Sequence, residues 1–185
     1  MAKTYTLHVA GLTRELPICK INDHLDIAAF IMFSDVELTI ACAKALLEKC
    51  PDFDVILTAE AKGIPLAYEM SRQSGKQWIP ARKGVKGYMA DPVIVEDQSI
   101  TTAGTQKLYL GRDDADLIRG KRILIMDDVI STGGSLKAME ALVQEAGGVV
   151  TGKVAVLAEG DAADRTDIKF LKKLPLFNAD GTVKD

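Results

Sequence analysis

The sequence is poor in cysteine and histidine, which limits the sites that it can build. Three of its 185 residues are cysteines, namely Cys19, Cys42 and Cys50, and two are histidines. An odd number of cysteines without metal-ligand spacing argues against both a disulfide framework and a zinc site. Neither histidine has a Ser, Cys or Asp neighbour at a spacing that suggests catalysis. We therefore expect free thiols and a reducing, cytoplasmic location.

Long apolar runs and an excess of positive charge are also missing. The longest uninterrupted apolar stretch, Ile27 to Phe33, is far shorter than a membrane span, and the first residues lack the apolar run of a signal peptide. The formal net charge is −3, from 23 basic and 26 acidic residues. This balance argues against a nucleic-acid-binding surface, so any phosphate must be bound by local groups.

What is present fits one globular domain, with 48% hydrophobic and 26% charged residues. From residue 34 onward, short apolar segments alternate with segments of helical periodicity. We expect strands at Val55–Leu57, Gln77–Pro80, Gln106–Leu110, Arg122–Met126 and Lys153–Leu157, and helices at Ile64–Ser74 and Gly134–Ala146. This order predicts an α/β fold with an open, mostly parallel twisted sheet and helices on both faces.

The ends of the chain show weaker patterns. Thr4–Val9 alternates polar and apolar residues and predicts a strand, and the segment that follows it to residue 33 is expected to be loosely structured. Ser34 and Glu37 have the spacing of a capping box, which predicts a helix running to about Cys50. Its apolar stripe comprises Val36, Ile40, Ala43, Leu47 and Cys50. Residues 84–105 are expected to form a lid or a hairpin, and the tail after residue 160 to form turns and short pieces.

The most informative segment runs from Ile123 to Ser135. Four apolar residues precede Asp127 and Asp128, and a small polar turn, Ser131-Thr132-Gly133-Gly134-Ser135, leads into apolar residues at helical spacing. A Ser/Thr/Gly turn that opens a helix aims N–H groups and hydroxyls at one point, which suits a phosphate. Paired carboxylates suit the hydroxyl groups of the same ligand, or a hydrated metal. The segment therefore indicates a ribose 5-phosphate site, although an ordinary strand–loop junction remains the alternative.

Two further turns carry positive charge after a predicted strand. Thr58-Ala59-Glu60-Ala61-Lys62-Gly63 repeats the strand–turn–helix order, with Gly63 allowing close backbone approach and Lys62 supplying a cation. Arg82, Lys83 and Lys86 follow the next strand. These cations either bind a second anionic group or are ordinary solvated side chains.

The segment 123–135 resembles the signature of type I phosphoribosyltransferases, which bind 5-phosphoribosyl-1-pyrophosphate (PRPP). The resemblance implies that Asp127 and Asp128 contact the ribose hydroxyls, while Ser131, Thr132, Gly133, Gly134 and Ser135 hold the 5-phosphate. It assigns the pyrophosphate to Ala61, Lys62 and Gly63 and to Arg82 and Lys83, with Lys86 and Tyr88 on a lid.

The resemblance also implies a reaction and its partners. A Mg²⁺-dependent enzyme would join a base, expected to be a purine, to PRPP and release pyrophosphate. The metal would be bound through PRPP, with Asp127 as the candidate protein contact. Lys62 and Arg82 would neutralise the leaving group, and Asp128 would assist a proton on the base. A homodimer is expected, and neither nucleic acid nor membrane is an expected partner.

The resemblance divides the chain as a single phosphoribosyltransferase domain of residues 1–185. Its core would span about residues 34–160, and residues 1–33 and 161–185 would form a hood that helps to recognise the base. Gly11–Pro17 and Leu157–Glu159 are loose candidates for base contacts. Adenine-specific members carry a Glu in the loop that corresponds to Ser99–Gly104, where this chain has no acidic residue.

Three alternatives stay open from the sequence. Lys62-Gly63-Ile64-Pro65 also resembles the orotate branch of the family. A non-catalytic PRPP-binding or nucleotide-binding regulatory protein could share the same motif. A generic α/β nucleotide-binding domain would require the motif to be a coincidence.

Overall fold

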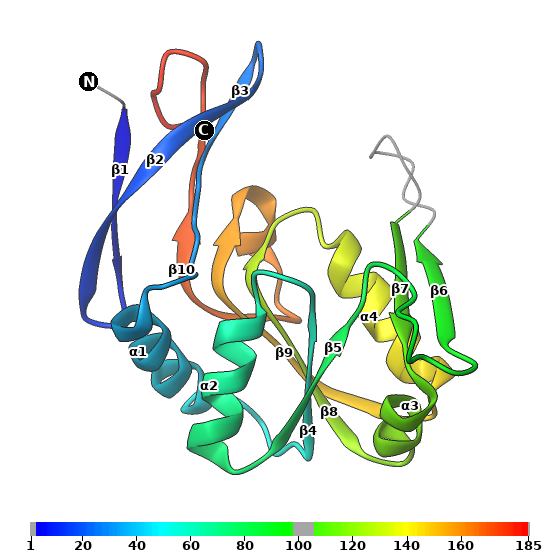
Figure 1. The fold of residues 1–185 in the computed structure, drawn as a ribbon. Coiled ribbons are helices and arrows are strands. Elements are labelled where there is room, and N and C mark those ends of the chain that lie inside the picture. The colour runs from blue at the N-terminus through cyan, green and yellow to red at the C-terminus, as the bar shows by residue number, and fades with distance from the viewer. Residues whose placement is uncertain (1–2, 98–105, 185) are drawn as a thin grey trace.

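The structure, a computed structural model, describes residues 3–97 and 106–184. At its centre lies a five-stranded sheet of order β10-β9-β8-β4-β5, in which every neighbouring pair is parallel. Helices α1 and α2 cover one face and α3 and α4 cover the other (Figure 1). The expected α/β fold with a parallel sheet and helices on both faces is confirmed. The strands are β4 (Val55–Ala59), β5 (Gln77–Ala81), β8 (Arg122–Ile130), β9 (Val149–Glu159) and β10 (Lys169–Leu174).

Strand β8 shows how the apolar runs build this arrangement. Ile123 and Ile125 belong to the core under α3 and α4, whereas Leu124 and Met126 belong to the core under α1 and α2. All four side chains are fully buried. Because the side chains of a strand alternate between the two faces of the sheet, a strand covered on both faces has a continuous apolar sequence.

β8 also continues past its apolar run, where we had expected it to end at Met126. Asp127, Val129 and Ile130 still pair with β9, which itself runs from Val149 to Glu159 rather than from Lys153 to Leu157. The acidic pair therefore lies inside the strand, near its end. Backbone pairing with a long neighbour extends a strand whatever the polarity of its side chains, and this is invisible to a rule based on apolar runs.

The helices mostly follow the expected boundaries. Helix α2 (Ile64–Ser74) agrees with the sequence, and α4 (Gly134–Glu145) ends one residue early. Helix α3 (Arg112–Ile118) is short and was not expected. β6 (Val93–Asp97) and β7 (Gln106–Leu110) pair antiparallel, consistent with the expected hairpin. The loop Ser99–Gly104, in which the sequence has no acidic residue, lies outside the described residues.

The first 33 residues are more regular than expected. β1 (Thr4–Val9) is confirmed, but the supposedly loose segment after it forms β2 (Leu12–Asn22) and β3 (Leu25–Ala28). Ala10 and Gly11, both with positive φ, form a two-residue turn between β1 and β2. Most β2 side chains are exposed or only half-buried, so the strand has no strong apolar alternation to reveal it.

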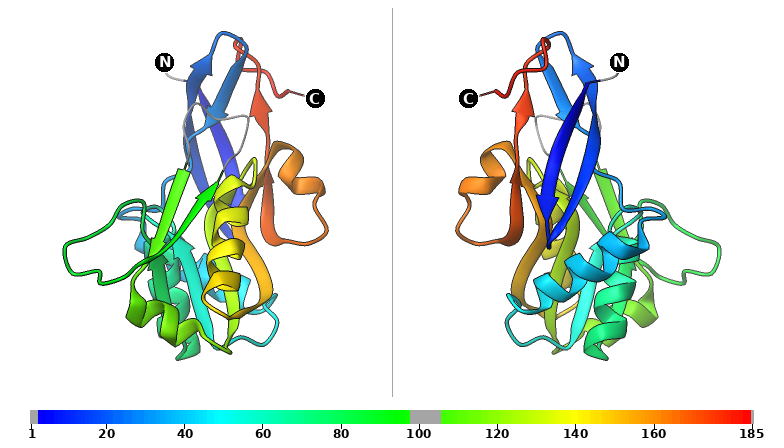
Figure 2. Two further views of the ribbon diagram at one scale, coloured as in Figure 1. Left: turned by 90° about the vertical axis from the view of Figure 1, so that its right-hand side faces the viewer. Right: turned by 90° about the vertical axis from the view of Figure 1, so that its left-hand side faces the viewer.

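The tail is also more regular than expected. After the 3₁₀ turn η1 (Gly160–Asp164), β10 joins the central sheet beside β9, and β11 (Leu176–Phe177) pairs with β3. The four-stranded sheet β1-β2-β3-β11 rises above the end of the central sheet toward which the strands point (Figure 2). The tail thus contributes to both sheets, and a core–hood boundary near residue 160 stays a prediction.

Helix α1 (Val36–Leu47) is capped by Asp35, whereas the sequence predicted Ser34 as the cap. Ser34 has a positive φ of 68°, and the side chain of Asp35 accepts the hydrogen bond from the Leu38 N–H. The buried face comprises Leu38, Thr39, Cys42, Ala43 and Leu46. Val36 and Ile40, which belong to the expected apolar stripe, are 68% and 43% exposed.

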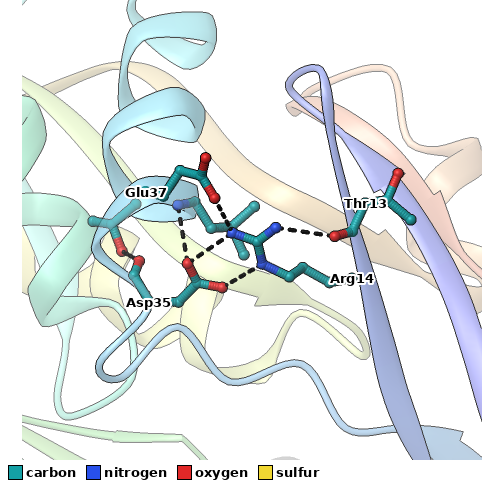
Figure 3. Close-up of polar contacts among 6 residues, drawn as sticks. Thr13, Arg14, Asp35 and Glu37 are labelled. Carbon is teal, nitrogen blue, oxygen red and sulfur yellow. Dashed lines mark hydrogen bonds and ion pairs between the residues drawn. The ribbon is translucent and has the colours of Figure 1, made fainter.

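A contact with β2 of the four-stranded sheet explains why α1 begins after Asp35. The Arg14 guanidinium on β2 donates two hydrogen bonds to Asp35, at 2.7 and 3.0 Å, and one to Glu37 at 2.7 Å (Figure 3). Arg14 keeps the pKa of Asp35 below its ordinary value. Glu37 is thereby used by Arg14 instead of closing a capping box on Ser34. The partner lies more than twenty positions away in the sequence, so the local pattern did not contain it.

Among residues 3–97 and 106–184, no helix combines the length and the apolar character needed to cross a membrane.

Candidate active site

The turns singled out in the sequence meet at one edge of the central sheet. β4, β5 and β8 are parallel neighbours, so the turns after β4 and β5 and the end of β8 lie side by side. A pocket of about 200 Å³ opens there. It brings together residues from all three strand ends: Ala59, Glu60, Ala61, Lys62, Lys83, Asp127, Asp128, Val129 and Ser135.

A second hollow of about 110 Å³ lies within the turn between β8 and α4. Its lining comprises Asp127 and the residues from Val129 to Leu136, including all five residues of Ser131–Ser135. Both hollows share Asp127, Val129 and Ser135. The acidic pair therefore lies between a hollow lined by the turn after β4 and one lined by the turn that opens α4.

The acidic pair is held in a state that favours a ligand. Asp128 is 2% exposed, and its Oδ2 lies 3.1 Å from the Lys62 Nζ. That contact lacks hydrogen-bond geometry, so Oδ2 has no hydrogen-bond partner within the described ranges. Burial, and next the charge of Asp128, raise the pKa of Asp127 above its ordinary value. A hydroxyl donor would supply the missing hydrogen bond to Asp128 Oδ2. A cation would reduce the repulsion between the carboxylates of Asp127 and Asp128.

Gly63 is required by a close approach rather than by its backbone angles. A Cβ at this position would lie 2.3 Å from Thr58 Oγ1 and 3.4 Å from Asp127 Oδ1. Gly63 is also the N-cap of α2, so no side chain covers the first N–H groups of that helix. The peptide bond between Glu60 and Ala61 is cis. The backbone of the turn thus packs closely against Thr58 and Asp127.

Gly133 has a different constraint, since its φ of +84° lies in the left-handed region. It caps α4 without a side chain, which leaves the first N–H groups of this helix free to face an anion. A Cβ on Gly133 would lie 2.6 Å from the Nη1 of Arg165, a residue that the sequence analysis did not single out.

Glu60 is a second residue that the sequence analysis missed. Its carboxylate accepts the Lys83 N–H at 2.6 Å and an Arg82 N–H at 3.3 Å, and the Lys86 Nζ lies 4.0 Å away. Burial acts to raise the pKa of Glu60, but the hydrogen bond from the Lys83 backbone N–H and the positive charges of Arg82 and Lys86 outweigh it and lower the pKa. The residue stands directly before Ala61-Lys62-Gly63, and that position was the signal that could have identified it.

The expected cations are therefore not all in one place. Lys62 and Lys83 line the pocket, whereas Arg82 and Lys86 are held on Glu60 at its side and are not among the lining residues. Within the described residues, no three His, Cys, Asp or Glu side chains form a group that could enclose a metal ion. Any metal at this site would need most of its ligands from a bound molecule.

Cys42 and Cys50 do not provide a nucleophile. Cys42 is buried and Cys50 is half-buried, and burial raises the pKa of their thiols to about 12 and about 11. A buried, protonated thiol is unreactive. Their state agrees with the expected free thiols.

Comparison with protein families gives one clear match. The family described as "Phosphoribosyl transferase domain" matches residues 37–180, most of the chain. The match begins in α1, includes the turns that line both hollows, and ends in the tail after β11.

Relatives and solved structures agree with this family. The chain is 35% identical over 108 residues to the adenine phosphoribosyltransferase of Thermotoga petrophila, which covers 58% of this chain and 60% of that protein. It is 34% identical over 145 residues to the adenine phosphoribosyltransferase of Ruminiclostridium cellulolyticum, covering 76% of each. A crystal structure of adenine phosphoribosyltransferase from Thermoanaerobacter pseudethanolicus aligns with a TM-score of 0.59 and 28% identity, over 74% of this chain and 79% of that one.

Proposed function

Because the chain belongs to the phosphoribosyltransferase family, we propose that it transfers the phosphoribosyl group of PRPP to a purine base and releases pyrophosphate. One observation carries the proposal: an acidic pair, of which Asp128 is buried, lies between two hollows, each beside a glycine turn that opens a helix. PRPP has the same order of groups, with ribose hydroxyls between a phosphate and a pyrophosphate.

Each part of the site has a proposed partner on PRPP. The 5-phosphate would be bound by Ser131, Thr132, Gly133, Gly134 and Ser135, whose backbone N–H groups open α4. Asp127 and Asp128 would accept hydrogen bonds from the ribose hydroxyls. The pyrophosphate would be bound by Ala61, Lys62 and Gly63 and by Lys83, with Arg82 and Lys86 recruited from Glu60.

Lys62 has to change partner when PRPP binds. The ammonium group of Lys62 balances Asp128, and its side chain is 52% exposed, so it is free to move. Ribose hydroxyls would take its place on Asp128. Lys62 and Arg82 would then offset the charge that develops on the leaving pyrophosphate as the bond at the anomeric carbon breaks. Asp128 is the candidate group to assist a proton on the base.

Mg²⁺ fits the chemistry of the donor set. Asp127 and the Oδ2 of Asp128, which lacks a hydrogen-bond partner among the described residues, are hard oxygen donors, the kind that Mg²⁺ prefers. Two carboxylates are too few to enclose the ion, so PRPP oxygens and water would supply the other ligands, with Asp127 as the candidate protein contact. When bound, Mg²⁺ would neutralise phosphate charge and orient the leaving group.

The proposed base is a purine, and the names of the relatives favour adenine among the purines. The orotate branch and a non-catalytic PRPP-binding protein remain the alternatives. We place the activity in the cytoplasm as part of the same proposal.

The decisive assay incubates the protein with PRPP, Mg²⁺ and one of adenine, hypoxanthine, guanine, xanthine or orotate. We expect nucleotide formation with a purine, dependent on Mg²⁺ and measured by chromatography of the product together with released pyrophosphate. Turnover with orotate alone would contradict the purine assignment. PRPP binding without turnover on any base would contradict the proposal that the protein is an enzyme and would favour the regulatory alternative.

We further propose that the protein is a homodimer joined through the groove between α1 and α2. This groove, of about 390 Å³, is lined by both polar and apolar residues of the two helices and their neighbours, and its apolar residues Val36, Ile40 and Tyr68 are exposed. Exposed apolar patches of this kind are typical of association surfaces. A second copy of the chain is the proposed occupant.

Replacing Ile40 by aspartate is expected to convert the dimer into a monomer, because an unpaired charge would be buried in the interface. Sedimentation velocity measures the change in mass. Val149→Asp is the matched control, since Val149 is also an exposed apolar residue but lies at the start of β9, away from the groove. A monomeric wild-type protein, or an Ile40→Asp variant that stays dimeric, would contradict this interface.

A further inference from the structure

The guanidinium of Arg165 lies against the turn that opens α4. Arg165 directly follows the 3₁₀ turn η1. It lies thirty residues after Ser135, the last residue of the turn that opens α4. Its Nη1 lies so near Gly133 that a Cβ there would be 2.6 Å away. The space that a side chain of residue 133 would need is thus occupied by the guanidinium.

Three charged side chains hold Arg165 in this place. Asp167 accepts two hydrogen bonds from one edge of the guanidinium, from Nε at 3.0 Å and from Nη2 at 2.7 Å. The same carboxylate accepts a hydrogen bond from the Lys153 Nζ at 2.6 Å, and Lys153 donates another to Glu140 at 2.6 Å. Arg165, and next Lys153, keep the pKa of Asp167 well below its ordinary value, so the carboxylate stays charged.

This chain of contacts, Arg165–Asp167–Lys153–Glu140, connects three parts of the fold. Glu140 belongs to α4, Lys153 to β9, and Arg165 and Asp167 to the segment before β10. Lys153 is 15% exposed, which protects its ion pairs from solvent screening. A guanidinium clamped along one edge is fixed in orientation as well as in position.

The clamp leaves the other edge of the guanidinium facing the turn. Neither N–H of Nη1 has a hydrogen-bond acceptor in the part of the chain that the structure describes, while Nε and Nη2 are both used. Arg165 does not line the hollow inside the turn, so it supports the turn from outside rather than facing a bound group directly.

We infer that Arg165 is a positioning residue for the 5-phosphate. By filling the space beside Gly133, the clamped guanidinium holds the Ser131–Ser135 turn in the shape that directs its N–H groups inward. This inference rests on the proposed function, since it assumes that the turn binds the phosphate of PRPP. It assigns to the tail of the chain a part in phosphate binding that no motif in the tail indicates.

The test compares two ligands that occupy different halves of the site. Calorimetry with Mg²⁺ gives the Kd of ribose 5-phosphate, which needs the turn, and of pyrophosphate, which needs the turn after β4. Arg165→Ala is expected to weaken ribose 5-phosphate binding about tenfold or more, because a misplaced cradle loses several hydrogen bonds together. Pyrophosphate affinity and Tm should stay close to the wild-type values, and the KM for PRPP should rise with little change in kcat.

Two further variants separate geometry from charge. Arg165→Lys keeps the charge but loses the clamped fork, and it should bind ribose 5-phosphate almost as weakly as Arg165→Ala. Lys172→Ala removes a cation from an exposed position on the neighbouring β10 and should behave as wild type. Wild-type affinity in Arg165→Ala, or full recovery in Arg165→Lys, would overturn the inference. Wild-type protein that binds neither ligand would instead refute the proposed function.

Discussion

Replacing Asp127 and Asp128 together by asparagine is expected to abolish PRPP binding while making the ligand-free protein more stable. The two carboxylates are adjacent, Asp128 is buried, and one of its oxygens lacks a hydrogen-bond partner within the described residues. Neutral amides remove the repulsion between the two carboxylates and the cost of burying a carboxylate charge. They also remove the only anionic oxygens proposed to face the ribose hydroxyls and Mg²⁺.

The pH dependence of this effect has a definite sign. The folded protein binds the Asp127 proton more tightly than the unfolded chain does, because burial, and next Asp128, raise the pKa of that carboxyl. Between the ordinary and the raised pKa, the folded state therefore holds more protons, and stability falls as pH rises. At pH 8 we expect Asp127→Asn to have a free energy of unfolding about 1 kcal/mol or more above wild type. Near pH 4 the two proteins should converge.

Urea unfolding at pH 4, 6 and 8 and calorimetry with PRPP and Mg²⁺ measure the two effects. Asp161→Asn is the control, since Asp161 is an exposed carboxylate in η1. It should change neither stability nor PRPP affinity. Wild-type PRPP affinity in the double variant would refute the ribose assignment. A stability difference that grows toward acidic pH would contradict the electrostatic explanation.

The second large effect is expected from a single methyl group on the turn after β4. In Gly63→Ala the new Cβ would lie 2.3 Å from Thr58 Oγ1, so either this side chain or the turn has to shift. Both border the acidic pair, and a displacement of about 1 Å in a binding turn costs on the order of a hundredfold in rate. We expect kcat/KM to fall about a hundredfold and the free energy of unfolding to fall by about 1–3 kcal/mol.

A second-site change tests whether this contact is the cause. Thr58 is fully buried and its hydroxyl has no hydrogen-bond partner within residues 3–97 and 106–184, so Thr58→Ala removes the obstacle without breaking a described hydrogen bond. The double variant Thr58→Ala/Gly63→Ala should regain most of the lost stability and part of the activity. Gly84→Ala is the control, because nothing lies within 4 Å of its added Cβ. Equal damage in the single and double variants would exclude the Thr58 contact as the cause.

Much of the central sheet could be predicted because its signals are local. β4, β5, β7 and α2 were expected at positions within two residues of those observed, since buried strands and amphipathic helices have short repeating patterns. The same applies to the residues around the acidic pair, because a small polar turn between an apolar run and a helical pattern is also recognisable within a short stretch of sequence. Asp127, Ser135, Lys62 and Lys83 were named from such patterns, and the structure brings them to one pocket.

Other elements depend on partners far away in the sequence. β2 and β3 are regular because they pair with each other and with β1 and β11, although their side chains carry little apolar pattern. The start of α1 is set by Asp35, which Arg14 holds from β2, rather than by the capping box at Ser34. β8 extends through the acidic pair because β9 runs beside it.

The sequence by itself determined that this protein has a parallel α/β sheet and a motif in which two carboxylates precede a small polar turn at the start of a helix. Those properties follow from residue type and spacing within a dozen positions. Only the tertiary structure decided which charged groups support that motif. Glu60 collects Arg82 and Lys86 beside the pocket, and Arg165 comes from the tail to occupy the space beside Gly133. Ion pairs and close approaches of this kind depend on distance in space, which the order of residues along the chain does not contain.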